Sequence, residues 1–180
     1  TVCGMALIST AGICGLHDKV VWMKQKIYYL IGLIMGFAIL VIAQSPSEKA
    51  RLIMCDVGQG DGILIIKSST QVLIDGGPST EKILSCLEKY VPFYDREIEL
   101  IVLTNTDFDH MNGLGAVIDR YQVMQFVTAD GVHKSDALTK IVDKIETNRI
   151  EIKAVERGDI LRISDKQGRK ILEFNVLWPP

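Results

Sequence analysis

Seventeen consecutive residues without a charge, Ile27 to Ala43, constrain the fold of this chain more than any other feature of its sequence. A membrane-spanning helix needs roughly 17–25 predominantly apolar residues, so this segment is long enough to cross a bilayer. Trp22, Tyr28 and Tyr29 lie at one end, where membrane helices often carry interfacial aromatic side chains. The alternative is a helix buried in a protein core. Because the segment has no side chain polar enough to face water, we predict a spanning helix over residues 27–43.

A second apolar stretch, Val2 to Leu16, is expected to be the end of an earlier spanning helix. A loop over residues 17–26 would connect the two helices, and it carries Lys19, Lys24 and Lys26. The positive-inside rule places such a loop in the cytoplasm. We therefore predict a multi-pass protein of the cytoplasmic membrane. Its parts would be a membrane segment over residues 1–50, ending in a linker over 44–50, and an extracytoplasmic domain over 51–180.

Residues 51–180 show the periodicities of a mixed sheet with helices packed on it. Three strand patterns come first, with a hairpin turn at Ser68 to Thr70, and βα units and further strands follow. This order predicts an α+β domain. The chain stops at Pro180 without a helix for the last layer, so we expect the domain to be truncated. Strands are predicted over residues 52–55, 62–67, 72–74, 98–103, 125–128, 150–155, 160–163 and 171–177, and helices over 79–91, 114–121 and 135–147.

Net charge and cysteine spacing exclude only a few classes of protein and of site. The net charge of -2 gives no support for a strongly cationic nucleic-acid binder, although it is compatible with a local basic groove. The cysteines have no CxxC spacing, so neither a zinc knuckle nor a disulfide framework is expected. We predict buried free thiols for Cys3, Cys14, Cys55 and Cys86.

Two carboxylates and an imidazole crowd the turn that follows the apolar run Ile98 to Leu103. Open α/β sheets bind ligands at the carboxyl ends of their strands, where this turn would lie. Oxygen-rich donors with one imidazole suit divalent metals, which can activate water for hydrolysis. We therefore predict metal binding by Asp107, Asp109 and His110. The alternative is an Asp-rich helix cap, because Asp is favoured at helix starts.

Two other loops follow predicted strands. Asp75 is followed by Gly76 and Gly77, and we expect its carboxylate to support the metal ligands, whereas a plain turn is the alternative. The loop from Asp56 to Gly62 contains three glycines. No helix follows that loop, so a nucleotide-binding function is not expected.

Three stretches of the sequence, taken in order, resemble the metallo-β-lactamase-like domain of the ComEC family of competence proteins. They are Asp56 to Asp61, Leu73 to Pro78 and Leu103 to Leu114, and Val176 to Pro180 is similar to the family's strand-ending pattern. The resemblance covers about residues 52–180. It implies an αββα sandwich of two sheets flanked by helices, here incomplete and preceded by one or two transmembrane helices.

The resemblance also implies roles for individual residues. Asp107, Asp109 and His110 match the family's metal-ligand motif, and Asp75 matches its strand-end aspartate, so Asp75 and Asp109 are the expected catalytic residues. The family's motif begins with His, whereas this chain has Asn105. Asn105 would be a weaker metal ligand through its amide oxygen, which prefers hard ions. The expected cofactor is a divalent metal, Mn, Mg or Zn, with two ions in the complete protein.

By the same resemblance, the protein would serve DNA uptake in natural transformation, with single-stranded DNA, the membrane and other competence proteins as partners. Its domain would hydrolyse DNA phosphodiesters with divalent metal. Asn105 keeps a second interpretation open, a catalytically silent module that binds the passing strand or shapes a channel mouth. A third is a hydrolase of small esters, because a fold alone does not define a substrate.

Overall fold

The computed structural model describes residues 10–45, 47–129, 136–164 and 168–177. Its packing divides the chain into two compact units, residues 1–45 and residues 46–180. Among the described residues, the first unit contains a single helix, and the second contains both sheets and the remaining helices.

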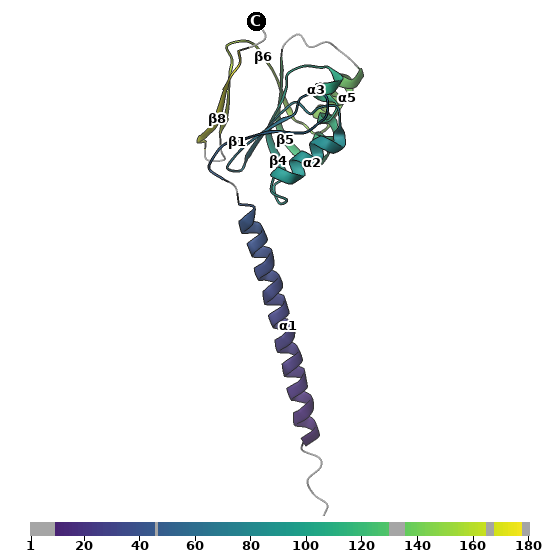
Figure 1. Cartoon of the computed structure of the whole chain (residues 1–180), viewed down its shortest axis with the longest axis vertical. Coiled ribbons are helices and arrows are strands. Elements are labelled where there is room, and N and C mark those ends of the chain that lie inside the picture. The colour runs from purple at the N-terminus through teal and green to yellow at the C-terminus, as the bar shows by residue number, and fades with distance from the viewer. Residues whose placement is uncertain (1–9, 46, 130–135, 165–167, 178–180) are drawn as a thin grey trace, which may run out of the picture. The chain divides into compact units, whose positions relative to one another are not determined.

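The first unit is built on one long helix, α1, which spans Thr10–Ala43 (Figure 1). The predicted loop over residues 17–26 is therefore wrong. Neither Gly nor Pro occurs between Gly15 and Gly32, and the Lys, Gln, Met and Leu side chains there are compatible with a continuous helix. The segment Trp22–Ala43 is 22 residues long with a mean hydropathy of 2.2, so its length and composition suffice to cross a membrane. It is the one such segment among the described residues, and it contains the predicted span.

A six-stranded sheet forms the centre of the second unit (Figure 1). The strands lie side by side in chain order. The first two pairings are antiparallel and the other three are parallel, as the predicted meander followed by βα units requires. Because β1, β3 and β4 run in the same direction, their carboxyl ends share one edge of the sheet. The strands are β1 Arg51–Met54, β2 Ile63–Lys67, β3 Thr70–Ile74, β4 Glu97–Leu103, β5 Gln122–Ala129 and β6 Glu151–Val155.

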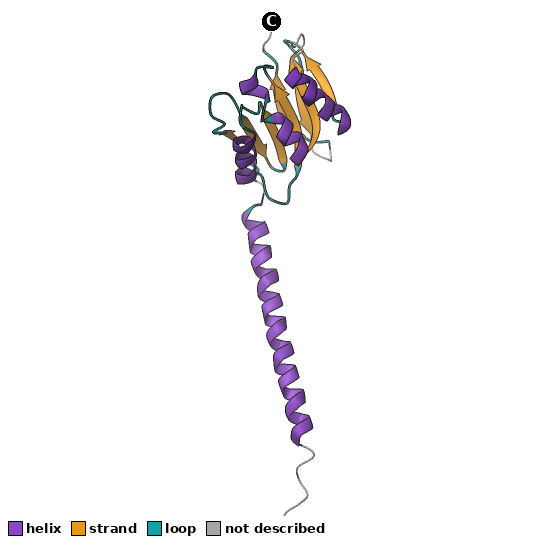
Figure 2. Cartoon of the chain, turned by 90° about the vertical axis from the view of Figure 1, so that its right-hand side faces the viewer, coloured by secondary structure: helices purple, strands orange, loops and turns teal. Residues whose placement is uncertain are grey.

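Helices cover one face of this sheet (Figure 2). They are α2 Thr80–Tyr90, α4 Leu114–Arg120 and α5 Asp136–Thr147, and a single helical turn, α3 Phe108–Met111, precedes α4. The Ser79 hydroxyl caps α2 by accepting a hydrogen bond from the Lys82 amide. Apolar side chains of α2, α4 and α5 share one core with the strands, so helical spacing in the sequence identified the buried faces correctly.

A two-stranded antiparallel sheet covers the opposite face. Its strands are β7 Ile160–Ser164 and β8 Lys170–Asn175, and Leu161 belongs to the same buried apolar cluster as Val72 and Leu100 of the large sheet. The second unit therefore has three layers, helices, sheet and sheet. This arrangement confirms the predicted α+β class and provides three of the four layers of the predicted αββα sandwich.

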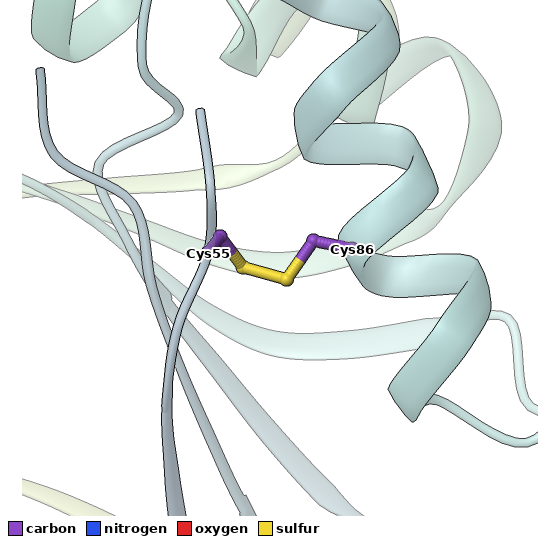
Figure 3. Close-up of a disulfide and its surroundings, with 2 residues drawn as sticks. All are labelled: Cys55 and Cys86. Carbon is purple, nitrogen blue, oxygen red and sulfur yellow. A yellow bond between two sulfur atoms is a disulfide. The ribbon is translucent and has the colours of Figure 1, made fainter. Parts of the chain in front are cut away.

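A disulfide joins Cys55 to Cys86, with their Cα atoms 5.7 Å apart (Figure 3). The prediction of free thiols is therefore wrong for these two cysteines. They are 31 residues apart in the sequence, and no local spacing marks them as a pair. The fold places the end of β1 against α2, and the bridge ties the loop after β1 to that helix. Cys3 lies outside the described residues.

Candidate metal centre

Three loops meet at the edge of the large sheet where β1, β3 and β4 end. They span residues 55–62, 75–79 and 104–113. The second and third loops are joined by two backbone hydrogen bonds. The Gly76 amide donates to the His110 carbonyl at 2.6 Å, and the Gly113 amide donates to the Gly77 carbonyl at 2.9 Å. The predicted ligand turn is thus fixed directly to the loop that carries Asp75.

Glycine is required where these loops touch. A Cβ atom on Gly60 would lie 2.1 Å from the Asp109 carbonyl oxygen, and one on Gly113 would lie 2.1 Å from the Gly76 carbonyl oxygen. Both distances are far shorter than any van der Waals contact, so a side chain at either position would push the loops apart. The glycines of the two sequence motifs therefore allow close approach of backbones.

Asp75 is buried at the place where these three loops meet, which we call the loop junction. It is only 2% exposed, and its φ of +56° lies in the left-handed region that Asp tolerates better than most residues. One carboxylate oxygen accepts a hydrogen bond from the Thr104 amide at 2.8 Å. The other lies within hydrogen-bonding distance of the Thr104 hydroxyl and of the His110 ring. These hydrogen bonds hold Asp75 in its strained backbone conformation, and such strain is common at functional sites.

His110 is oriented by Asp75, with 2.9 Å between its Nδ1 and the carboxylate oxygen Oδ2. This hydrogen bond raises the pKa of His110, and the charges of Asp75, Asp109 and Asp61 add to the effect, while partial burial opposes it. In the neutral ring, a proton on Nδ1 leaves the Nε2 lone pair available as a metal ligand. Nε2 has no hydrogen-bond partner among the residues that the structure describes.

Asn105 and Asp107 form a separate pair on the same turn. The Asn105 amide donates to the Asp107 carboxylate at 2.8 Å, and its oxygen accepts from the Asp107 backbone amide at 3.3 Å. Asp107 occupies the N-cap position of α3, but its side chain makes no capping hydrogen bond. A helix cap therefore does not account for this carboxylate. Both side chains are exposed.

Asp109 lies in α3, one residue before His110. Its charge contributes to the raised pKa of His110, and its carbonyl group lies against Gly60. No hydrogen bond or ion pair of its carboxylate occurs within the described part of the chain. The predicted residues thus lie on two adjoining loops, with Asp75 and His110 in direct contact and Asn105 bonded to Asp107.

Two residues of the junction were missed by sequence reasoning. Thr104 donates twice to Asp75, and Asp61 lies 3.9 Å from His110 Nδ1 through its Oδ2 atom. The ligand atoms of Asp61, Asp75 and His110 all lie within 4.8 Å of one another. The sequence contained a signal for Asp61, because its glycine-rich loop follows a strand. Asp75 and the ligand turn also follow strands.

The chemistry of these donors fits a divalent cation. Carboxylates with one imidazole suit Mn, Mg or Zn, and the close approach of Asp61 to Asp75 concentrates negative charge around a single imidazole. Both oxygens of Asp75 already have partners, so Asp75 is suited to hold the imidazole in place behind the ligands. The structure therefore supports a divalent-metal site at this edge.

Known proteins similar to this chain were found by sequence and by structure. The chain is 28% identical over 158 residues to ComE operon protein 3 of Bacillus subtilis, an alignment that covers 78% of this chain and 20% of that protein. It is 27% identical over 99 residues to Recombination protein 2 of Haemophilus influenzae, covering 53% of this chain and 13% of that protein. The chain thus spans a fifth or less of the length of these relatives. Both matches confirm the resemblance to ComEC that the motifs predict.

Similar solved structures include the chemotaxis sensor ODP in its peroxy diiron form and the Rm3 metallo-beta-lactamase. The sensor gives a TM-score of 0.45 at 17% identity, covering 67% of this chain and 47% of that one. The Rm3 enzyme gives a TM-score of 0.44 at 16% identity, covering 68% and 50%. TM-scores below 0.5 do not by themselves define a shared fold.

The model of one protein family matches a large part of the sequence. Its description is metallo-beta-lactamase superfamily, and the match extends over residues 55–165. That range includes the three loops, strands β2 to β7, and both cysteines of the disulfide. The chain therefore belongs to the metallo-beta-lactamase superfamily.

Proposed function

We propose that this chain is part of a membrane protein of DNA uptake whose domain hydrolyses DNA phosphodiesters with a divalent metal. The observation that carries the proposal is the loop junction, where buried Asp75 holds the His110 ring at 2.9 Å. The similarity to ComE operon protein 3 supports the uptake role, because the ComEC resemblance implies it. The apolar segment Trp22–Ala43 supports a membrane location by length and composition.

Each site residue has a role in this proposal. Asp107, Asp109 and His110 would hold the metal, and Asp75 would keep the His110 proton on Nδ1 so that Nε2 stays available. A bound divalent ion would offset charge on the phosphoryl oxygens and supply activated water.

Phe108 offers a contact for the nucleic acid itself. It lies between Asp107 and Asp109, and 61% of its surface is exposed. Single-stranded nucleic acids stack their bases on exposed aromatic rings, each worth roughly 1–3 kcal/mol. A base stacked on Phe108 would bring the neighbouring phosphate towards the carboxylates of the turn.

The disulfide supports an extracytoplasmic position for residues 47–177. Structural disulfides persist in oxidising compartments and are rare in the cytosol of mesophiles. Cys55 and Cys86 form such a bridge. An alkaline phosphatase fused after Leu177 should therefore be active, because that enzyme needs an oxidising compartment. Activity of a cytoplasmic reporter at the same position would contradict the orientation.

Nuclease activity tests the catalytic part of the proposal. We expect the purified membrane protein to cleave single-stranded DNA with Mn or Mg, and Asp109→Asn to reduce the rate at least about 100-fold, as expected when metal catalysis is lost. Asp56→Asn is the matched control, because it removes the same charge from an exposed residue paired with Lys82. Equal cleavage rates for the parent and Asp109→Asn would reject hydrolysis at this site.

A silent module is the second candidate, and the Asn105 side chain favours it. Its amide is bonded to the Asp107 carboxylate, one of the proposed ligands. Asn105→His should tighten Mn binding by about 10-fold or more if the side chain faces the metal, and calorimetry would measure this. Tighter binding without cleavage would support the silent module. Unchanged affinity would mean that position 105 is not part of the metal site.

A further inference from the structure

We propose that Asp61 is a metal ligand of this site and compensates for the imidazole that Asn105 does not supply. This inference deepens the proposed function and rests on its metal centre. Asp61 belongs to a different loop from the predicted ligand turn, and the sequence motif of that turn does not include it. The ligand set would therefore join the loop after β1 to the turn after β4.

The position of the Asp61 carboxylate is the first argument. Its Oδ2 atom lies 3.9 Å from His110 Nδ1, which is too long for a hydrogen bond but places this carboxylate beside the imidazole that Asp75 orients. The ligand atoms of Asp61, Asp75 and His110 lie within 4.8 Å of one another. In the described part of the chain, this is the one group of His, Cys, Asp or Glu side chains that meets this condition.

The availability of Asp61 is the second argument. Asp75 is almost fully buried, and both its oxygens have partners in Thr104 and His110. Asp61, in contrast, accepts no hydrogen bond from any described residue, and 59% of its side chain is exposed. Its carboxylate oxygens therefore lie beside His110 without accepting a hydrogen bond from a described residue.

The rigidity of the loop is the third argument. The Cys55 amide donates to the Gly62 carbonyl at 2.8 Å, which closes the loop at its base, and the disulfide fixes Cys55 to α2. Val57 is 1% exposed and packs against Gly77. Gly60 rests on the Asp109 carbonyl. These contacts fix the residues on either side of Asp61, so its backbone is held beside the ligand turn at little entropic cost.

Asp56 provides the contrast within the same loop. Its side chain is 94% exposed and lies 3.4 Å from the Lys82 ammonium group, so its charge already has a counterion. Asp56 is absent from the metal-compatible group. The two carboxylates therefore carry the same charge on the same loop but face different surroundings.

The test compares Asp61→Asn with Asp56→Asn in the complete membrane protein, using MnCl₂ alone as the probe. Calorimetry and Mn electron paramagnetic resonance report binding without any substrate. We expect Asp61→Asn to weaken Mn affinity by about 10–100-fold and Asp56→Asn to change it less than about 2-fold, given the usual cost of lost metal-site groups. Equal affinities of the parent and Asp61→Asn would overturn the proposal.

The alternative is that Asp61 serves only as a counterion of protonated His110. Asp61→Asn would then lower the His110 pKa in an NMR titration while Mn affinity stayed at the parent value, an outcome that overturns the proposal. A parent protein that binds no Mn would overturn it too. A parent whose Mn binding depends on Asp61 but which cleaves no DNA would support Asp61 as a ligand and reject hydrolysis, so the two failures are distinguishable.

Discussion

Acidic side chains gather at both edges of the large sheet, but the two groups are built differently. At the carboxyl ends of the strands, Asp61 and Asp75 surround His110. At the amino ends, carboxylates line an open hollow together with Arg162 of the small sheet. The residues of this amino-edge hollow that carry a carboxylate are Asp95, Glu97, Glu99 and Glu151.

Two of the amino-edge carboxylates accept hydrogen bonds from Gln71. Glu99 accepts a hydrogen bond from the Gln71 backbone amide at 2.7 Å, and Asp95 accepts one from the Gln71 side chain at 2.9 Å. Gln71 is completely buried, and its side-chain oxygen has no partner among the described residues. These acids satisfy donors of the sheet, whereas Asp75 orients an imidazole whose other nitrogen stays free.

The comparison shows that a count of carboxylates does not identify a site. The amino-edge hollow has four of them, yet no imidazole lies among the residues that line it. The carboxyl edge combines a fully hydrogen-bonded acid, an oriented imidazole and an acid that accepts no hydrogen bond from a described residue, and these donor types suit a divalent cation. Three changes to the sequence would test this contrast.

Removing the disulfide should loosen the carboxyl edge more than the amino edge. Cys55→Ala with Cys86→Ala removes a bridge between residues 31 apart, and disulfides of this loop length contribute about 3–4 kcal/mol. We expect hydrogen exchange in residues 55–62 to accelerate strongly, while residues 95–99 change little. Reduction of the parent protein with dithiothreitol should reproduce the effect. Equal acceleration at both edges would mean that the bridge stabilises the whole domain and not the loop.

Asp75→Ala should lower the free energy of unfolding by about 2 kcal/mol. The change leaves the Thr104 donors without an acceptor and puts Ala in a left-handed backbone conformation. Thermal unfolding would measure the stability. The pKa of His110 should fall towards its ordinary value, because the hydrogen bond that raises it is lost. Asp75→Asn is the control, since it retains an acceptor and tolerates the same backbone. An unchanged pKa in the Ala variant would contradict the described geometry.

Glu99→Gln should have the smallest effect and act only on the amino edge. Burial raises the pKa of Glu99 from 4.5 to about 6, although its hydrogen bond with the Gln71 amide opposes the shift. The folded state then binds more protons than the unfolded state between those values, so Glu99 makes stability fall as pH rises through that window. At neutral pH the free energy of unfolding of the variant should exceed that of the parent by about 1 kcal/mol or less, because Glu99 is only partly buried.

The pH dependence supplies the control for Glu99. Unfolding free energies of the parent and the variant should converge below pH 4.5 and separate between pH 4.5 and about 6, which urea titrations at several pH values would show. Mn affinity should be the same in both. A constant difference at all pH values would mean that Gln changes packing and not ionisation.

The order of elements could be predicted from the sequence because local patterns determine it. Helical spacing in α2 identified the face that is buried, and the Ser68 turn identified the hairpin. The turn after β4 was also found, because two acids and an imidazole directly after a buried strand are unusual in a purely structural loop. Three of the four predicted ligand residues lie within one turn of α3, so their proximity required no knowledge of the fold.

Long-range pairings could not be predicted, since no local spacing encodes them. Cys55 meets Cys86 only because β1 lies against α2, and Asp61 meets His110 only because Gly60 permits contact with Asp109. The loop predicted over residues 17–26 failed for a different reason. Charged residues suggested a turn there, but a continuous helix accommodates them without any helix-breaking residue.

The strand order of the large sheet has a consequence for how the domain is made. Each strand pairs with the strand synthesised just before it, so the sheet can grow at one edge while the chain leaves the ribosome. Every residue of the candidate metal centre precedes residue 114. The centre can therefore assemble while β5 and β6 are still being translated, and nascent chains that end after α4 should already resist proteolysis across the three loops.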